Sequence, residues 1–271
     1  MNITFIGGGN MAAAMIGGLL KQGWTPASIR VVEIAAAARE RLARELRIEA
    51  DVEISATSAA ADCIVLAVKP QSLRAAARAL RPFLGAQLVI SIAAGIRMGD
   101  LSRWLAGYRR IVRVMPNTPA LARAGISGLC AMPAVSADER ARAQNVLSAV
   151  GTTLWLENED QLDAVTAVSG SGPAYVFYFM EALQQAAGEL GFKPEEARRL
   201  ALETFAGAVR LVAESGEEAA VLRARVTSKG GTTERALAVM DAQALRQIVS
   251  DAVRAAADRS RELGDELGRS D

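Results

Sequence analysis

Three consecutive glycines near the start of the chain form a pattern that binds phosphate groups. They follow the apolar run Ile3–Ile6 and precede a helical pattern, so that G-x-G-x-x-A stands between a predicted strand and a predicted helix. In that setting glycines permit a tight turn and close approach of a ligand, and the helix N-terminus offers free N–H groups to a pyrophosphate. The alternative is a tight turn without a ligand. We interpret the segment as a dinucleotide-binding loop, with the candidate residues Gly7, Gly8, Gly9, Asn10, Met11 and Ala12.

An acidic residue, Glu33, ends the second predicted strand, where a carboxylate would accept hydrogen bonds from an adenosine ribose. A carboxylate there favours NADH over NADPH, because the 2′-phosphate of NADPH would meet like charge. Arg39 and Arg41 lie close enough in sequence to accommodate that phosphate, so both cofactors stay open. A solvated glutamate at a strand end is the alternative to a ribose contact.

Two further candidate residues follow predicted strands, at the edge of a sheet where ligands gather. Lys69 comes directly after the strand Asp62–Val68, and Asn117 lies in a loop that two prolines stiffen. Lys69 is suited to a phosphate or a ribose, and the Asn117 amide is suited to a carboxamide or a ribose. As alternatives, Lys69 is a solvated lysine and the Asn117 loop is a rigid turn.

The segment Val226–Thr233 combines glycines and hydroxyl side chains directly before a helical pattern, Glu234–Met240. Neutral donors at a helix N-terminus make a nest for an anion, and this one suits a small carboxylate. A threonine-capped helix start is the alternative. A second glycine-rich segment, Ser169–Pro173, interrupts a helical stretch, which is typical of a backbone approach to a ligand or of a hinge.

The composition excludes several kinds of chemistry. The 271 residues include no histidine, which removes Ser-His-Asp and Cys-His triads and His-ligated metals. The two cysteines, Cys63 and Cys130, cannot supply a disulfide framework or a zinc site, so no metal is expected. A net charge of +1 gives no basic field that would recruit nucleic acid. With no leader pattern and no apolar run that would span a membrane, we expect a cytoplasmic protein.

Short apolar runs alternate with helical patterns in the first half of the chain. This alternation predicts a parallel, doubly wound sheet that helices cover on both faces. The predicted strands are residues 3–6, 29–33, 62–68, 87–92, 110–115, 125–131 and 152–156. The predicted helices of this half are residues 10–22, 35–46, 70–80, 98–105 and 137–150.

Beyond residue 158 the strand patterns stop and helical patterns take over. We therefore predict a dinucleotide-binding domain over residues 1–158 and an all-helical domain over residues 159–271. The run Ala174–Met180 is apolar on all sides, and a helical domain of this size has little depth in which to bury it. We expect the helical domain to pack against a second copy of itself.

Five motifs stand in order along nearly the whole chain: FIGGGNM, AVKP, RVMPNTP, SGSGPAY and VTSKGGTTERAL. In this combination the chain resembles the pyrroline-5-carboxylate reductase family. The resemblance implies reduction of 1-pyrroline-5-carboxylate to L-proline with NADPH or NADH, the last step of proline biosynthesis. It also implies a Rossmann-type domain followed by a helical dimerisation domain with interlocked subunits, and dimers that can assemble into a decamer.

By position, the resemblance implies roles for residues of this sequence. Cofactor contacts fall on Gly7–Ala12, Glu33, Ala67, Val68, Lys69 and Pro70, and the loop that holds the substrate carboxylate falls on Ser228, Gly230, Gly231, Thr232 and Thr233. Thr233 aligns with the threonine proposed to hydrogen-bond the ring nitrogen, which makes it the candidate catalytic residue. The chain departs from many members at Lys229, where they have proline, and at Glu33 and near residue 54, where members that favour NADPH carry other residues.

The missing histidine is consistent with imine reduction. A cyclic imine is protonated from water near neutral pH, and a hydride then reaches an already activated carbon, so no strong general acid is required. Two other functions compete with this one. A β-hydroxyacid dehydrogenase would carry a catalytic lysine on the first long helix of its second domain, and residues 174–191 contain none. A non-catalytic nucleotide sensor would need no carboxylate-binding loop.

Overall fold

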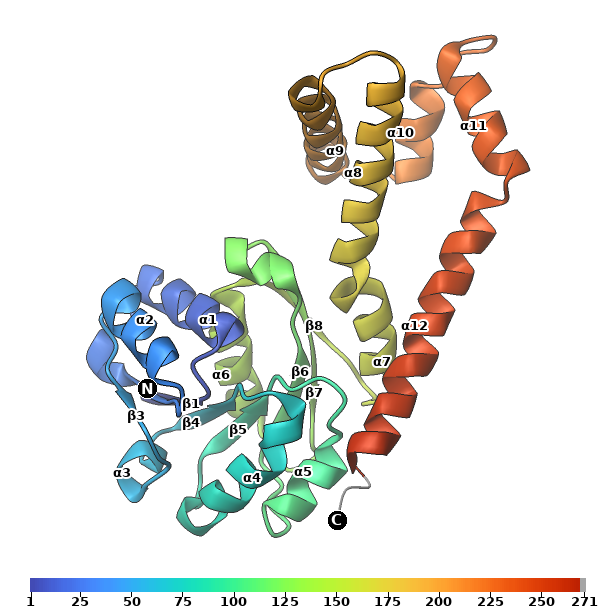
Figure 1. Ribbon diagram of the computed structural model, residues 1–271. Helices are drawn as coiled ribbons and strands as arrows, with labels where there is room; N and C mark the ends of the chain where they lie inside the picture. The colour runs from blue at the N-terminus through green and yellow to red at the C-terminus, as the bar shows by residue number, and fades with distance from the viewer. Residues whose placement is uncertain (269–271) are drawn as a thin grey trace. The chain divides into compact units, whose positions relative to one another are not determined.

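The computed structural model describes residues 1–268, so the last three residues of the predicted helical domain, 269–271, lie outside the described residues. The chain forms two compact units (Figure 1). Unit 1 contains residues 1–171 together with the chain from Ala256 onward, and unit 2 contains residues 172–255. No helix within residues 1–268 is long and apolar enough to cross a bilayer.

Unit 1 is built on an eight-stranded sheet with the order β3-β2-β1-β4-β5-β6-β7-β8. The strands are β1 (Ile3–Ile6), β2 (Ile29–Val32), β3 (Ala50–Asp51), β4 (Cys63–Leu66), β5 (Leu88–Ser91), β6 (Ile111–Met115), β7 (Gly125–Ala131) and β8 (Gly151–Trp155). The first six strands have the order of a dinucleotide-binding Rossmann sheet, which confirms the predicted fold class. The edge strand β3 was not predicted, because two residues are too few for a periodic pattern.

The prediction of an all-parallel sheet is wrong at one pairing, between β6 and β7, which is antiparallel, so that β7 and β8 run opposite to the first six strands. The connection between them, residues 116–124, holds only a short 3-10 turn, Thr118–Ala122. A parallel connection needs a crossover of about a dozen residues or more, so this loop can only return the chain in the opposite direction. β8 then runs parallel to β7, after the helix α6 (Ala137–Ser148).

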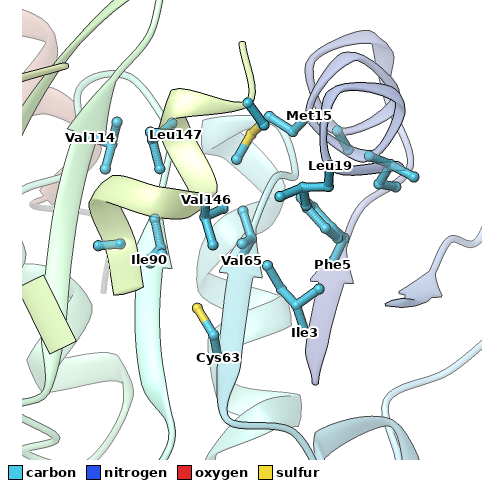
Figure 2. Packing of buried hydrophobic residues seen from close by; sticks show 14 of the residues in the cluster. Ile3, Phe5, Met15, Leu19, Cys63, Val65, Ile90, Val114, Val146 and Leu147 are labelled. Atoms are coloured by element: carbon cyan, nitrogen blue, oxygen red, sulfur yellow. The ribbon is translucent and has the colours of Figure 1, made fainter. Parts of the chain in front are cut away.

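Helices cover both faces of the sheet, and alternate strand residues point to opposite faces. On one face Ile3 and Phe5 of β1 pack with Met15 and Leu19 of α1 (Asn10–Lys21) and with α6 (Figure 2). The neighbouring residue Ile6 points to the other face, in a second core cluster. The helices of the second face include α4 (Pro70–Leu80) and α5 (Met98–Trp104), and the remaining helices before α7 are α2 (Ala36–Leu46) and α3 (Ala56–Ala59).

Both cysteines lie within these cores as free, buried thiols. Burial raises the pKa of the Cys63 thiol far above its usual value, and it also raises the pKa of the Cys130 thiol. A thiol held in its protonated form is a poor nucleophile, so neither cysteine is suited to catalysis.

The predicted break at Ser169–Pro173 is a π-helical turn rather than a loop. After α7 (Gln161–Val165), the π turn Thr166–Gly170 leads directly into α8 (Gly172–Glu189). The Ser171 N–H donates to the Thr166 carbonyl at 2.8 Å, five residues back. An extra residue in one turn shifts the register of the following helix, and such turns frequently mark functional sites.

Unit 2 is entirely helical. It contains α8, α9 (Pro194–Ser215), α10 (Ala219–Arg225), α11 (Thr232–Ala242) and the first part of α12 (Leu245–Gly268). The predicted apolar run on α8 leaves large side chains exposed in the single chain, including Phe177 and Tyr178, the latter with 73% of its surface accessible. These side chains have the exposure expected of a helix that a second copy would cover.

The two compact units divide the chain differently from the predicted boundary at residue 158. Residues 159–171 cluster with the sheet, as does the end of α12. Leu162 of α7 is fully buried in the core of the second face, which explains why this segment belongs to unit 1. The predicted boundary lies where the strand patterns end. The boundary of the compact unit lies further along the chain, because α7 packs on the sheet.

Candidate functional site

The glycine-rich turn between β1 and α1 is sterically restricted at its first two glycines and open at the third. Gly7 has a φ of +101°, and a Cβ there would lie 2.7 Å from the carbonyl oxygen of Ala67, at the end of β4. A Cβ on Gly8 would lie 2.7 Å from Leu42 Cδ1. A Cβ on Gly9 would meet nothing within 4 Å, so the space over this residue is open. The turn therefore closes tightly beneath Gly7 and Gly8 and presents its backbone at Gly9.

Glu33 lies beside this turn, and its carboxylate holds two backbone groups. Oε2 accepts from the Gly8 N–H at 2.6 Å, and Oε1 accepts from the Ala35 N–H at 2.7 Å. Each carboxylate oxygen can accept a further hydrogen bond, so a ribose contact stays a prediction. The first role that the geometry gives Glu33 is to tie the end of β2 to the dinucleotide-binding turn.

The two arginines that the sequence placed near Glu33 both lie at this end of the sheet. Arg41 donates to Asn10 Oδ1 at 2.7 Å and to the Gly8 carbonyl at 3.1 Å, and its Nε is buried without a hydrogen-bond partner. Arg39 donates to the carbonyls of Glu33 and Ile34 at 3.0 and 2.8 Å. One carboxylate and two guanidinium groups therefore meet where an adenosine ribose would lie in a Rossmann site.

A cavity of about 530 Å³ opens next to these residues, at the carboxyl ends of β1, β2 and β4. Its walls are mostly apolar and include Ile34, Val52, Ile54, Val68 and Ala76, with Glu33 and Gly7 at its edge. An apolar slot of this size with a carboxylate at its rim suits an adenine base and its ribose. Val52 and Ile54 were not candidates from the sequence, because they follow the two-residue strand β3.

The remaining cofactor candidates lie on loops that adjoin the turn. Lys69 is exposed at the start of α4, and Pro70 occupies the first helical position. The Asn117 amide, in contrast, is engaged within unit 1: its Nδ2 donates to the Ser169 carbonyl at 3.1 Å, and its Oδ1 accepts from the Ile126 N–H at 3.0 Å. These bonds tie the loop after β6 to the π turn and to β7. They support the alternative in which the Asn117 loop is a rigid turn.

In unit 2, the predicted anion-binding segment forms a turn that leads into α11. Gly231 is the N-cap residue, and Thr232 and Thr233 are the first two residues of the helix. The Gly231 N–H donates to the Ser228 carbonyl at 3.0 Å, and the Gly230 N–H donates to Glu234 Oε2 at 2.7 Å. The N–H groups of Thr232 and Thr233 belong to the first helical turn, which has no intrahelical acceptors. Thr232 and Thr233 therefore offer open donors, as does the N–H of Glu234, and the two glycines serve the shape of the turn.

Comparisons with known proteins agree with this arrangement. A family model described as NADP oxidoreductase coenzyme F420-dependent matches residues 2–95, and a model of pyrroline-5-carboxylate reductase dimerisation matches residues 159–263. The chain is 49% identical to a pyrroline-5-carboxylate reductase of Pseudomonas aeruginosa and 42% identical to that of Pasteurella multocida. These alignments cover 98% and 97%, respectively, of both chains.

Solved structures give the same result. A pyrroline-5-carboxylate reductase from Coxiella burnetii is similar with a TM-score of 0.91 and 40% identity. A Plasmodium falciparum pyrroline carboxylate reductase with NADP bound is similar with a TM-score of 0.85 and 27% identity. Both similarities cover 97% of this chain and 98% of the other. Together, the full-length identity and the matched dimerisation model establish that this chain belongs to the pyrroline-5-carboxylate reductase family.

Proposed function

We propose that this protein reduces 1-pyrroline-5-carboxylate to L-proline with NAD(P)H, as the last step of proline biosynthesis. One observation carries the proposal. This chain, which aligns with a family member over 98% of both lengths, has an open dinucleotide-binding turn at Gly9 and also a helix N-terminus with open donors at Thr232 and Thr233. The first feature suits a nicotinamide cofactor, and the second suits the carboxylate of a small substrate. The competing sensor function would leave the second feature without a purpose.

The residues of this chain would act by positioning. The turn Gly7–Gly9 would hold the cofactor pyrophosphate, and the cavity beside Glu33 would hold its adenosine. When bound, the cofactor supplies the hydride. The N–H groups of Thr232 and Thr233 would bind the substrate carboxylate, and the Thr233 hydroxyl would accept a hydrogen bond from the protonated ring nitrogen. That bond keeps the nitrogen protonated, so its neighbouring carbon stays electrophilic without a histidine.

Steady-state turnover tests the proposal directly. Purified protein is mixed with 1-pyrroline-5-carboxylate and with NADH or NADPH in parallel, and the loss of the reduced nicotinamide absorbance is followed while proline is quantified. Proline formed in a one-to-one ratio with oxidised cofactor supports the proposal. Cofactor binding without turnover would favour a nucleotide sensor. Oxidation of a hydroxy acid in a separate assay with NAD+ or NADP+, without reduction of the imine, would favour a dehydrogenase.

The choice between NADH and NADPH depends on Glu33. We expect Glu33→Gln to shift the ratio of kcat/KM values toward NADPH by about fivefold, because the amide oxygen can still accept one of the two N–H groups, that of Gly8 or that of Ala35, while the charge that repels a 2′-phosphate is gone. Parallel kinetics with both cofactors measure the shift. Glu45→Gln removes an exposed carboxylate on the nearby helix α2; it is the matched control and should leave the ratio unchanged. A ratio that stays constant in Glu33→Gln means that Glu33 does not face the ribose.

Glu234 orders the substrate turn through its bond to Gly230, whose φ is +74°. We expect Glu234→Ala to raise the KM for 1-pyrroline-5-carboxylate by about threefold, because an exposed charge-assisted hydrogen bond that orders the donors is lost. Glu234→Gln keeps an acceptor oxygen and should stay within about twofold of the wild type. Equal KM values in all three proteins would show that this bond does not order the turn.

Assembly and location complete the proposal. We infer a homodimer whose interface includes the exposed apolar side chains of α8, such as Phe177 and Tyr178, with dimers that assemble into a decamer. The matched dimerisation model supports an oligomer of some size. A cytoplasmic location is supported by the two free thiols, Cys63 and Cys130, which are typical of a reducing compartment.

A further inference from the structure

The loop between β5 and α5 lies at the nicotinamide side of the proposed cofactor site. It follows the carboxyl end of β5. In the sheet order β2-β1-β4-β5, the strands β4 and β5 lie on one side of β1 and β2 lies on the other. In a Rossmann sheet the adenosine half binds on the β2 side of the crevice and the nicotinamide half binds on the β4 and β5 side. The loop begins with small residues, Ala93, Ala94 and Gly95, which permit close approach of a ring.

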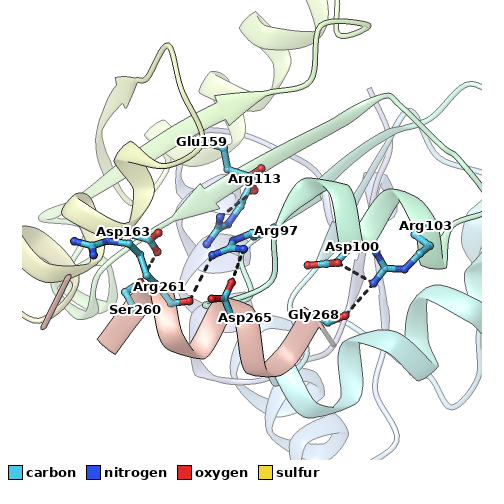
Figure 3. A network of polar contacts seen from close by, with 10 residues as sticks. All are labelled: Arg97, Asp100, Arg103, Arg113, Glu159, Asp163, Ser260, Arg261, Asp265 and Gly268. Carbon is cyan, nitrogen blue, oxygen red and sulfur yellow. Dashed lines mark hydrogen bonds and ion pairs between the residues drawn. The ribbon is translucent and has the colours of Figure 1, made fainter. Parts of the chain in front are cut away.

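The end of α12, residues 256–268, packs directly on this loop (Figure 3). Gly95 has a φ of +73°, and a Cβ there would lie 2.9 Å from Leu267 Cδ1. Arg97 forms an ion pair with Asp265, with 2.7 Å between Nη1 and Oδ1. Its guanidinium also lies over Gly264, where a Cβ would come within 3.3 Å of Arg97 Nε. A side chain at position 264 would make a tight contact that the Arg97 guanidinium would have to relieve by shifting.

The same stretch of helix is fixed to the rest of unit 1 on either side of the Arg97 contact. Ser260 Oγ donates to Asp163 Oδ1 of α7 at 2.6 Å, with 5% and 7% of the two residues exposed. Toward the end of the helix, Arg103 of α5 donates to the Gly268 carbonyl at 2.9 Å and pairs with Asp100 at 2.8 Å. The buried Ser260 bond sets the position of the helix, so Asp265 arrives opposite Arg97 in one register.

A partly buried ion pair holds the loop from the side of the sheet. Arg113 of β6 is only 6% exposed, and its Nη1 lies 2.9 Å from Glu159 Oε1. The same carboxylate oxygen accepts from the Met98 N–H at 2.6 Å, at the start of α5. The loop is therefore fixed between the sheet and α12. A cavity of about 330 Å³ remains beside it, lined by Pro70, Gln71, Gly95, Thr166, Ser260 and Leu263.

We propose that the end of α12 is a positioning element of the cofactor site, and that it acts through Arg97 on the loop 93–97. The proposal rests on the proposed function, because it takes the ligand of this crevice to be NAD(P)H. Arg97 is a positioning residue: it holds Gly95 and its neighbours in the conformation that receives the nicotinamide. Loss of its pairing with Asp265 would let the loop spread over several conformations, and binding would then have to order it.

A double-mutant cycle tests this role. We expect Arg97→Ala and Asp265→Ala each to raise the Kd and the KM for NADPH or NADH by about fivefold, and the double variant to raise them no further. The KM for 1-pyrroline-5-carboxylate and the melting temperature should change little. Ser260→Ala should raise the cofactor Kd and KM in the same way, because it releases the helix at Asp163, and it should also lower the melting temperature, because the buried Asp163 carboxylate loses a donor. Arg261→Gln breaks an exposed pair with Asp258 on the same helix and is the matched control.

The outcomes separate the proposal from its rivals. If Arg97→Ala weakens cofactor binding and Asp265→Ala does not, Arg97 contacts the cofactor itself and the positioning role is overturned. If both variants lower only the melting temperature, the helix end serves stability alone, and the proposal is again overturned. Cofactor Kd values come from nicotinamide fluorescence and need no turnover. A wild type that binds NADPH but does not reduce the imine would therefore refute the proposed function while this cycle still gives its answer.

Discussion

Replacing Thr233 by alanine is expected to lower kcat for 1-pyrroline-5-carboxylate reduction by at least about tenfold, while cofactor binding stays intact. Thr233 is the second residue of α11, beside the N–H groups that would hold the substrate carboxylate. In the proposed function, the Thr233 hydroxyl would accept a hydrogen bond from the ring nitrogen of a substrate whose carboxylate is bound there. Its loss would remove the acceptor that keeps this nitrogen protonated and the contact that orients the imine carbon toward the hydride.

Two variants of the same turn control for this result. Thr233→Ser keeps the hydroxyl and should retain kcat within about threefold. Thr232→Ala keeps the backbone donor at the first helical position and should change the KM for the imine more than kcat. Single-turnover measurements with bound cofactor separate the chemical step from product release. Unchanged single-turnover rates in Thr233→Ala would remove Thr233 from the mechanism.

Replacing Gly9 by alanine is expected to raise the KM and the Kd for the nicotinamide cofactor by at least about tenfold without lowering the melting temperature. Gly9 has φ and ψ of −65° and −175°, a conformation that alanine adopts without strain, and a Cβ would meet no protein atom within 4 Å. The added methyl group would instead occupy the space through which a pyrophosphate approaches the N–H groups of α1.

Gly7→Ala provides the contrast. Its φ of +101° and the 2.7 Å approach to the Ala67 carbonyl oxygen make any side chain both strained and in collision with backbone. This variant should lower the melting temperature as well as the cofactor affinity, as measured by thermal unfolding and by nicotinamide fluorescence. If Gly9→Ala bound the cofactor as the wild type does, the pyrophosphate would not lie over Gly9.

The apolar periodicity predicts most of unit 1 because its strands are buried on both faces. The predicted strand at residues 62–68 contains β4, and the predicted helix at 70–80 is α4 with the same bounds. The elements that were not predicted, β3, α3 and α10, are short, so they carry no periodic pattern. The direction of β7 depends on the length of the loop between β6 and β7. An alternation of strand and helix patterns does not predict that direction.

The candidate site, like the fold, contains some features that the sequence predicts and others that it does not. A turn that needs glycine at a fixed backbone conformation, such as Gly7, is visible in the sequence because only one residue type fits. The π turn is also marked by glycines in the sequence, although those glycines predict a break in the helix and not a π turn. Contacts such as Arg97 with Asp265 join charged residues from distant parts of the chain, and many other surface pairs would have satisfied the sequence equally well. The bond from Gly230 to Glu234 likewise depends on a side-chain conformation.

Unit 1 is assembled from two stretches of sequence that the whole of unit 2 separates. During synthesis the chain emerges from its N-terminus, and domains generally fold as they appear. The strands between Ile3 and Trp155 are therefore available long before residues 256–268 leave the ribosome. A nascent chain can form the sheet early, but it gains the Arg97–Asp265 and Asp163–Ser260 contacts only after residues 256–268 have emerged. Chains that terminate early would then carry a folded sheet that retains cofactor poorly, which leaves them open to proteolytic quality control.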